Sequence, residues 1–464
     1  MPDRKFSLSA HIFTRDLRTD DNPALLSALE SSGCVITCFA EERNLSAAHS
    51  PGCGNRLAFL SESLDCLSSE IAKKGGVLGF YPEGAVNLAE ELCRSGVEAV
   101  FMTHDYTPYA GRREALVEKA CNNAGCSFFA VPGSLLNEPE EVKKKDGGNY
   151  TVFTPFFRKA SLIPVYEPRE CTYLNFSRED FPGKTDSAVK TVKRDPGENK
   201  AIFRGGRNSG LELLENTGRL VNYEKERNYP AVRGTSMLSA HLRFGTVSIR
   251  EAFHAVAEKL GPGHGLIRQL YWRDFFTHVA FFHPYVFKGP FHRRFESLTW
   301  SNNGEIFERW CSGGTGFPIV DAGMREMNET GYMHNRVRMV AASFLVKDLH
   351  IDWRRGERYF ATKLTDYDPS VNNGNWQWAA STGCDAQPYF RIFNPWLQQK
   401  KFDPECLYIR RWIPELSEAQ PEEIHNLYRR EDDPPGGYPK PVTDHKAEAQ
   451  AAKILYSDAA RSEI

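Results

Sequence analysis

The chain has 464 residues, of which 41% are hydrophobic and 12% aromatic, and its formal net charge is −2. This length favours two domains, or one domain with a large cap, and the apolar content is sufficient for a sizeable core. The near-neutral charge argues against a globally basic nucleic-acid-binding protein, although a local basic groove would be compatible with it.

Up to about residue 135, short β-rich runs alternate with amphipathic segments. We expect strands at 8–13, 34–40, 77–81, 99–103 and 127–131, with helices such as 55–72 and 84–94 between them. Such alternation predicts a parallel sheet covered by helices. The loop after the first strand, 14–22, contains no glycine, so it is not a dinucleotide-binding fingerprint.

The pattern changes after this region. Residues 136–210 form a polar connection, in which the aromatic cluster 150–157 is expected to dock. From about 211 onward helix-period patterns dominate, for example at 319–327 and 333–346 with Gly331 as a helix stop, and the last candidate helix is 446–455. We therefore predict an α/β domain at 5–135, a connector at 136–210 and an all-helical domain at 211–456.

Cysteine usage and hydropathy predict the compartment. The eleven cysteines show neither a CxxC pair nor regular spacing. This favours reduced, mostly buried thiols over a disulfide framework, a zinc site or an iron–sulfur cluster, so no metal is expected. Because no stretch suits a transmembrane helix or a signal peptide, we expect no membrane partner and a cytoplasmic location, with nucleoid association in a prokaryotic host.

One segment is unusually rich in polar and aromatic side chains. Residues 366–378 read Asp-Tyr-Asp-Pro-Ser-Val-Asn-Asn-Gly-Asn-Trp-Gln-Trp. Buried Asp and Asn need hydrogen-bond partners, so the segment suggests a pocket for a polar heterocycle with indoles beside it. Taken alone, a polar loop followed by an amphipathic helix with two core tryptophans is the simpler interpretation.

Four further segments accompany it, namely 13–22, 315–325, 330–339 and 389–395. Together they resemble the photolyase/cryptochrome flavoprotein family, most closely its class I cyclobutane pyrimidine dimer photolyases, over about residues 7–456. The resemblance implies an α/β fold with a Rossmann-like parallel sheet for the N-terminal, antenna-binding domain. It also implies an all-α C-terminal domain that binds FAD and UV-damaged DNA. The reduced form of the FAD is expected to be the active one, and the protein is expected to be a monomer.

The resemblance implies a specific set of residues for the flavin site. The cofactor-binding positions are Tyr223, Thr235, Ser236, Met237, Leu238, Ser239, Arg273, Arg338, Asp366, Tyr367, Asp368 and Asn372. Hydroxyls and N–H groups at a helix start suit the diphosphate, although simple helix caps would otherwise explain Thr235 and Ser239. Asn372 matches the position beside flavin N5, and Arg338 is expected to pair with Asp366.

The resemblance also implies a lesion site. Its DNA-contacting positions are Arg227, Gln269, Trp272, Asn335, Arg336, Met339, Trp378, Arg391, Gln398 and Lys400. Trp272 and Trp378 match indoles that wall the pocket for a flipped dimer. The catalytic positions are Gln269, Asn335, Met339 and Asn372. Solvated surface charges remain an alternative for the basic residues, as does core packing for Met339.

Lesion preference depends on three of these positions. Photolyases for the (6-4) lesion carry histidines in place of Asn335 and Met339, so this chain favours cyclobutane dimers. Gln269 points the other way, because cyclobutane enzymes usually have glutamate there, whereas (6-4) enzymes and many cryptochromes have glutamine. An amide cannot supply a proton, so slower repair or an altered substrate preference stays open.

Two accessory functions follow from the same resemblance. Trp376, Trp353 and Trp300 match a chain of three indoles that carries electrons from the flavin to the surface, although buried core aromatics would look the same in the sequence. The segment 105–114 lacks the glutamate of folate binders. It therefore favours 8-hydroxy-5-deazaflavin over methenyltetrahydrofolate as the antenna chromophore.

The expected function is light-dependent DNA repair by a carbon–carbon lyase, in which photoexcited reduced FAD supplies an electron that splits cyclobutane pyrimidine dimers. The alternatives are a (6-4) photolyase and a cryptochrome photoreceptor. The end of the chain 52 residues after Trp412 leaves little room for a long signalling tail, which favours the enzyme. A flavin oxidoreductase is disfavoured because nicotinamide-site motifs are absent from the sequence.

Overall fold

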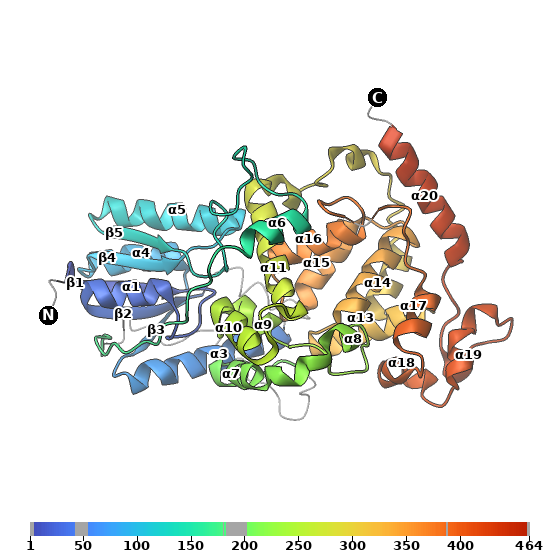
Figure 1. Ribbon diagram of the computed structural model, residues 1–464, viewed down its shortest axis with the longest axis horizontal. Coiled ribbons are helices and arrows are strands. Elements are labelled where there is room, and N and C mark those ends of the chain that lie inside the picture. The colour runs from blue at the N-terminus through green and yellow to red at the C-terminus, as the bar shows by residue number, and fades with distance from the viewer. Residues whose placement is uncertain (1–3, 42–53, 180, 182–201, 387, 462–464) are drawn as a thin grey trace. The chain divides into compact units, whose positions relative to one another are not determined.

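The computed structural model describes residues 4–41, 54–179, 181, 202–386 and 388–461 (Figure 1). The described residues fall into two compact units. The first unit contains the residues up to 181 together with 203–221 and 236–282, and the second contains 202, 222–235 and 283–461. The domain boundaries 5–135, 136–210 and 211–456 follow secondary structure and stay a prediction. Residues 180 and 182–201 of the connector lie outside the described part.

The first unit is built on a parallel sheet, as the sequence predicts. Its strands are β1 (Phe6–Phe13), β2 (Ser32–Ala40), β3 (Leu78–Tyr81), β4 (Ala99–Thr103) and β5 (Ser127–Val131). Their order is β3-β2-β1-β4-β5, and every neighbouring pair is parallel. The order of connection reverses between β1 and β4, which is where open α/β sheets leave a crevice at the strand ends.

Helices connect these strands and cover the sheet (Figure 1). They are α1 (Pro23–Ser31), α3 (Gly54–Lys73), α4 (Ala85–Arg94) and α5 (Pro108–Asn123). Asn22 and Thr107 cap α1 and α5 with side-chain oxygens, and each of these helices begins with proline. Right-handed crossovers put α1 and α3 on one face and α4 and α5 on the other.

The remaining elements are helical, so the predicted fold class is confirmed. The first unit adds α6 (Phe153–Ala160), α7 (Arg207–Glu215), α9 (Ser239–Phe244), α10 (Ile249–Leu260) and α11 (Gly265–Phe282). The second unit contains α8 (Tyr223–Glu226), α12 (Gly304–Ser312), α13 (Pro318–Thr330), α14 (Asn335–Lys347), α15 (Trp353–Lys363), α16 (Pro369–Ala379), α17 (Pro395–Phe402), α18 (Leu407–Trp412), α19 (Pro421–His425) and α20 (His445–Arg461). Short 3-10 helices occur at Asn216–Asn222, Pro284–Phe287, Arg293–Ser297, Pro414–Leu416, Leu427–Arg429 and Pro435–Gly437.

The junction of α13 and α14 organises the second unit. Gly331 ends α13 in the left-handed conformation, with φ of 72°, as the sequence predicts. A buried core of the second unit includes most of the inner face of α14 with Phe317, Trp353 and Trp376. This packing fixes the direction of the first turn of α14.

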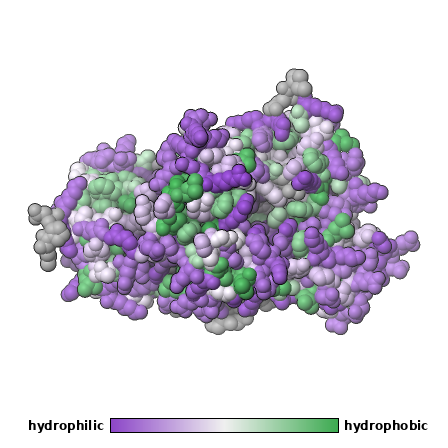
Figure 2. All heavy atoms as spheres, viewed as in Figure 1, coloured by the Kyte–Doolittle hydropathy of each residue, from purple (hydrophilic) through white to green (hydrophobic). Residues whose placement is uncertain are grey.

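Figure 2 shows one face of the molecule coloured by hydropathy. There, small groups of hydrophobic residues are scattered among hydrophilic ones. Among the helices that the structure describes, none is both long enough and apolar enough to cross a membrane.

Candidate functional site

The first turn of α14 brings two predicted lesion contacts together. His334 caps this helix, since its Nδ1 accepts from the backbone N–H of Arg336 at 3.2 Å. Asn335 and Met339 lie one turn apart on the same helix face, and the Asn335 amide donates to the Met339 sulfur at 3.6 Å. Asn335 is exposed and Met339 is half-buried. Both can therefore meet a ligand, which core packing of Met339 would prevent.

Arg336 belongs to a basic, aromatic group near this turn. Its Nη2 donates to Asn228 Oδ1 at 2.7 Å, and its guanidinium lies 4.4 Å above the Phe402 ring. Its Nε is buried and has no hydrogen-bond partner within the described part of the chain. Burial lowers the pKa of Arg336, and the charge of Arg227 lowers it further. Arg227 itself lies 5.0 Å above the Tyr223 ring. Two close cations suit an anionic ligand such as a phosphate.

The ion pair predicted between Arg338 and Asp366 is present. Arg338 Nη2 donates to both Asp366 oxygens, at 3.1 and 3.0 Å, and Arg338 Nε donates to the Met333 carbonyl at 2.7 Å. The Asp366 side chain is only 5% exposed and that of Arg338 is 24% exposed. A single guanidinium thus ties α14 to the loop that leads into α16.

The start of α16 is fixed by its own sequence. Asp368 caps the helix, because its carboxylate accepts from the N–H groups of Ser370 and Val371 at 3.1 and 3.2 Å. Pro369 occupies the first helical position, where its missing N–H costs nothing. Ser370 Oγ is buried and has no hydrogen-bond partner among the residues that the structure describes, so it is a polar atom that a cofactor could satisfy.

Glu357 is a residue that the sequence analysis missed. Asn372 Nδ2 donates to Glu357 Oε1 at 2.9 Å, and Tyr367 also donates its hydroxyl to Glu357. Burial raises the pKa of Glu357, while these hydrogen bonds lower it. Two predicted cofactor-binding residues therefore converge on one carboxyl group of α15. Because the Asn372 nitrogen faces Glu357, its oxygen is turned away as an acceptor.

The two tryptophans of α16 have different environments. Trp376 is 2% exposed and Trp378 is half-buried, as expected for positions two residues apart on a helix. The Trp376 ring lies 4.9 Å from Phe360. A side chain at Gly356 would come within 2.2 Å of the Trp376 ring, which explains the glycine there. The Trp378 ring lies 6.5 Å from Phe393.

The predicted electron-transfer tryptophans share one region of the second unit. Trp353 is 2% exposed in the same core as Trp376, and half-buried Trp300 packs against that core 6.5 Å from Tyr456. Their function as a wire stays a prediction. The sequence analysis missed Trp310, a fully buried indole 6.2 Å from Trp376.

The predicted contacts to the DNA backbone lie at and near α17. Arg391 and Lys400 are exposed, as a contact to a large anionic partner requires. Gln398 is half-buried, and its Oε1 is shielded from solvent without a hydrogen-bond partner among the described residues. Their DNA-binding function stays a prediction.

In the first unit, Trp272 is stacked on an aromatic neighbour. Its ring lies 3.7 Å from that of Phe153, with an interplanar angle of 7°. Phe153 comes from α6, within the aromatic cluster that was expected to dock, and Trp272 comes from α11, one turn after half-buried Gln269. Phe153 therefore fixes the plane of the Trp272 indole.

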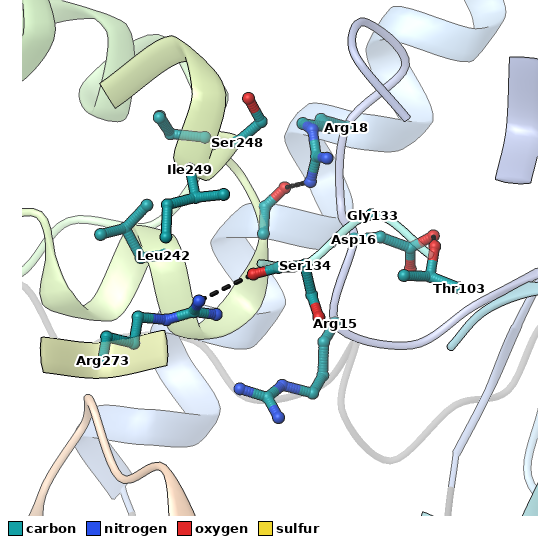
Figure 3. Close-up of a pocket in the computed structure, with 12 residues that line it drawn as sticks. Arg15, Asp16, Arg18, Thr103, Gly133, Ser134, Leu242, Ser248, Ile249 and Arg273 are labelled. Carbon is teal, nitrogen blue, oxygen red and sulfur yellow. Dashed lines mark hydrogen bonds between the residues drawn. The ribbon is translucent and has the colours of Figure 1, made fainter. Parts of the chain in front are cut away.

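Arg273 lies on the same helix and contacts a loop after β5. Its Nη1 donates to the Ser134 carbonyl at 2.7 Å (Figure 3). Neighbouring Asp274 accepts from the N–H of Leu136 at 2.7 Å, and burial raises the pKa of Asp274 to about 7. Arg273 also lines a small hollow together with Arg15 from the loop after β1 and Leu242 and Ile249 from α9 and α10.

The predicted diphosphate-binding segment has an unusual backbone. Met237 has a φ of 59°, a backbone conformation that residues other than glycine rarely adopt. Ser236 Oγ accepts from the Leu238 N–H at 3.4 Å, and Ser239 begins α9. In the second unit, Thr235 forms a hydrogen bond with Tyr332. Contact of these residues with a cofactor stays a prediction.

Comparison with known proteins identifies the family. Residues 9–171 match the family described as DNA photolyase, and residues 266–458 match the FAD binding domain of DNA photolyase. A deoxyribodipyrimidine photo-lyase of Agrobacterium fabrum is 34% identical over 96% of both chains. The chain belongs to the DNA photolyase family.

Solved structures agree with this assignment. An archaeal photolyase from Sulfolobus tokodaii, whose crystal structure contains two FAD molecules, is 39% identical with a TM-score of 0.86, over 97% of this chain and 100% of that one. A class III photolyase from Agrobacterium tumefaciens is 32% identical with a TM-score of 0.89, over 98% of both chains. The polar groups around α16 fit a flavin cofactor, since Asn372 and Ser370 offer hydrogen-bonding atoms near the partly buried Arg338–Asp366 ion pair.

Proposed function

We propose that this protein repairs UV-damaged DNA in the light by splitting cyclobutane pyrimidine dimers. Bound FAD, once reduced and photoexcited, supplies the single electron that opens the two cross-links of the dimer. The observation that carries the proposal is the link between the exposed first turn of α14 and the polar start of α16, made by Arg338 and Asp366. It ties a lesion-binding surface to a flavin-binding segment within the second unit.

The work of the α16 region is to bind and orient the flavin ring. The hydrogen bond to Glu357 holds the Asn372 amide in one orientation. The amide oxygen can then accept a hydrogen bond from a protonated flavin N5, and it would not repel an anionic flavin as a carboxylate would. Asp366, neutralised by Arg338, can accept from the ring or the ribityl chain. Groups fixed in advance lose little free energy when the flavin changes its charge.

The first turn of α14 recognises the lesion in this proposal. Asn335 offers an exposed amide to the pyrimidine carbonyls, and Met339 adapts its shape to the distorted dimer. Arg336 and Arg227 would bind the adjacent phosphates. Stacking of Trp272 and of Trp378 on the lesion stays a prediction from the sequence. A dimer already stacks poorly in duplex DNA, so its extrusion costs less than that of an intact pair.

A (6-4) photolyase is the second candidate, and Gln269 favours it. The first turn of α14 argues against it, because Asn335 and Met339 cannot transfer a proton as histidine can. Buried His334 is no substitute, since burial lowers its pKa to about 4 and its Nδ1 is used by the helix cap. A cryptochrome photoreceptor would share the flavin site and repair neither lesion.

One assay separates these functions. FAD-loaded, chemically reduced protein is illuminated with oligonucleotides that carry either a cyclobutane thymine dimer or a (6-4) product, and restored thymines are counted. We expect repair of the first substrate only. Asn335→Ala should bind and repair it at least several-fold less well, whereas Asn375→Ala, which alters an exposed asparagine of α16, should repair it normally. Restoration of the (6-4) product, or of neither lesion, would replace the proposal with one of the alternatives.

Electron transfer through tryptophan is part of the same proposal. Trp376→Phe should block photoreduction of oxidised FAD and spare repair by protein reduced chemically, because the indole is needed only to refill the flavin. Trp396→Phe is the matched control, since Trp396 is also buried in this core and lies outside the predicted wire. Normal photoreduction by the Trp376→Phe variant would contradict electron transfer to the flavin through Trp376.

We further propose an antenna chromophore at the edge of the sheet, with 8-hydroxy-5-deazaflavin favoured over methenyltetrahydrofolate. Arg15 follows β1 and pairs with Asp105, which follows β4, at 3.2 Å. This pair lies where the strand order reverses, a position that ligands favour. Reconstitution with deazaflavin, folate or excess FAD, followed by an action spectrum, tests the proposal. Energy transfer from FAD or folate alone would contradict the deazaflavin preference.

A further inference from the structure

Three cysteines of the first unit converge although they are far apart in the sequence. Cys93 lies in the last turn of α4, Cys121 lies in the last turn of α5, and Cys126 directly precedes β5. Their three sulfur atoms all lie within 4.8 Å of one another. The turn at Gly125, with φ of 71°, returns the chain so that the Cys126 N–H donates to the Cys121 carbonyl at 2.9 Å.

The described surroundings of these sulfurs are mainly apolar. Cys121 and Cys126 are buried in an apolar core, and Cys93 is partly exposed beside it. Within the residues that the structure describes, one group of three or more cysteine, histidine or acidic side chains lies close enough to share an ion, and it is this one. It consists of thiols alone. Thiolate ligands select soft cations over Mg²⁺ or Ca²⁺.

The spacing is close to what such a cation needs. Zinc–thiolate bonds of about 2.3 Å place three sulfurs about 4 Å apart around one ion, so small side-chain rotations would close the site. Cys93 and Cys121 both lie at helix C-terminal ends, where the partial negative charge of the last carbonyls favours a cation. The partly exposed side of Cys93 leaves a fourth position for water.

We propose that Cys93, Cys121 and Cys126 form a binding site for a divalent thiophilic cation of the zinc class. Binding releases the three thiol protons, and three thiolates with one divalent ion leave a net charge of −1 beside the solvent-accessible edge. No oxidation or reduction takes place. The ion would join the ends of α4 and α5 to the start of β5, and so stabilise one edge of the first unit.

The proposal differs from the expectation, based on the sequence, that the protein binds no metal. Cys93 lies 28 residues before Cys121, and Cys121 lies five residues before Cys126, so no CxxC pair marks the site. Only the packing of α4 against α5 brings the first thiol to the other two.

Cadmium titration of the full-length reduced protein, under argon, tests this site directly. Cd²⁺ reports thiolate coordination by a near-ultraviolet charge-transfer band, and Zn²⁺ competition then gives the zinc affinity. We expect one equivalent to bind, with protection of Cys93 from alkylation as measured by mass spectrometry. Cys93→Ser should weaken binding at least tenfold. Because Cys93 is partly exposed, this variant should keep its fold, which far-ultraviolet circular dichroism verifies.

Cys34→Ser provides the matched control, since Cys34 is also partly exposed in the first unit and lies outside the group. It should bind cadmium as the unaltered protein does. Absence of the band at several equivalents of Cd²⁺ would overturn the proposal. Equal affinity in Cys93→Ser and Cys34→Ser would overturn it as well, because binding would then occur elsewhere.

Discussion

Replacement of Arg338 by methionine should destabilise the second unit by about 2–3 kcal/mol. Removing one partner of a fully buried ion pair costs about 3–5 kcal/mol, because the remaining charge has no compensation. The Asp366 side chain is almost fully buried, whereas that of Arg338 is 24% exposed. Solvent therefore screens the charge that remains, and the loss of stability is smaller than for a fully buried pair. The Met333 carbonyl also loses its 2.7 Å donor, which adds to the cost.

Urea unfolding of the flavin-free protein measures this effect, since bound flavin would stabilise the folded state by itself. Tryptophan fluorescence is a suitable probe, because seven of the eight tryptophans lie in the second unit and only Trp272 lies in the first. Asp366→Leu and the double variant complete a cycle, in which we expect a coupling free energy of about 2 kcal/mol.

Arg354→Met is the matched control for Arg338→Met. Arg354 pairs with Asp352 at 2.8 Å, but the two side chains are 34% and 18% exposed. Such a pair contributes about 1 kcal/mol or less. If Arg338→Met cost no more than Arg354→Met, or if the cycle gave a coupling below about 0.5 kcal/mol, the reasoning that joins α14 to α16 through this pair would be refuted.

Three further predictions follow from single contacts. Phe153→Ala should weaken binding of dimer-containing DNA about 10-fold by fluorescence anisotropy without lowering FAD content, because Trp272 loses its stacking partner; unchanged affinity would contradict this. Glu357→Leu should release the Asn372 amide and shift the flavin reduction potential by some tens of millivolts, whereas an unshifted potential would separate Glu357 from the cofactor. Burial raises the pKa of Glu326 to about 7 from an unfolded value of 4.5, so its favourable contribution is complete below pH 4.5 and is lost as pH rises through 7. Glu326→Gln should therefore match the unaltered protein near pH 4 and exceed its unfolding free energy by about 3 kcal/mol at pH 8.5, and a constant difference across this range would contradict the assignment.

Local sequence patterns determined the main elements. All five strands were predicted to within two residues at each end, because a buried parallel strand is a short apolar run between turn residues. Gly331 was predicted as a helix end for an equally local reason, since the left-handed conformation there favours glycine. The family motifs are also short local segments, so the sequence by itself identified the family and supplied the residues that we propose for the flavin and lesion sites.

Tertiary structure alone decided which side chains support those residues. Glu357 lies in a stretch of α15 rich in charge and shows its importance only when Asn372 of α16 donates to it. Phe153 is one of several aromatic residues in its segment until it is stacked on Trp272 of α11. Cys93 is 28 residues from the nearest thiol that it joins. Contacts of this kind depend on how whole helices pack, and a helix presents only part of its surface to each neighbour, so no spacing within the sequence encodes them.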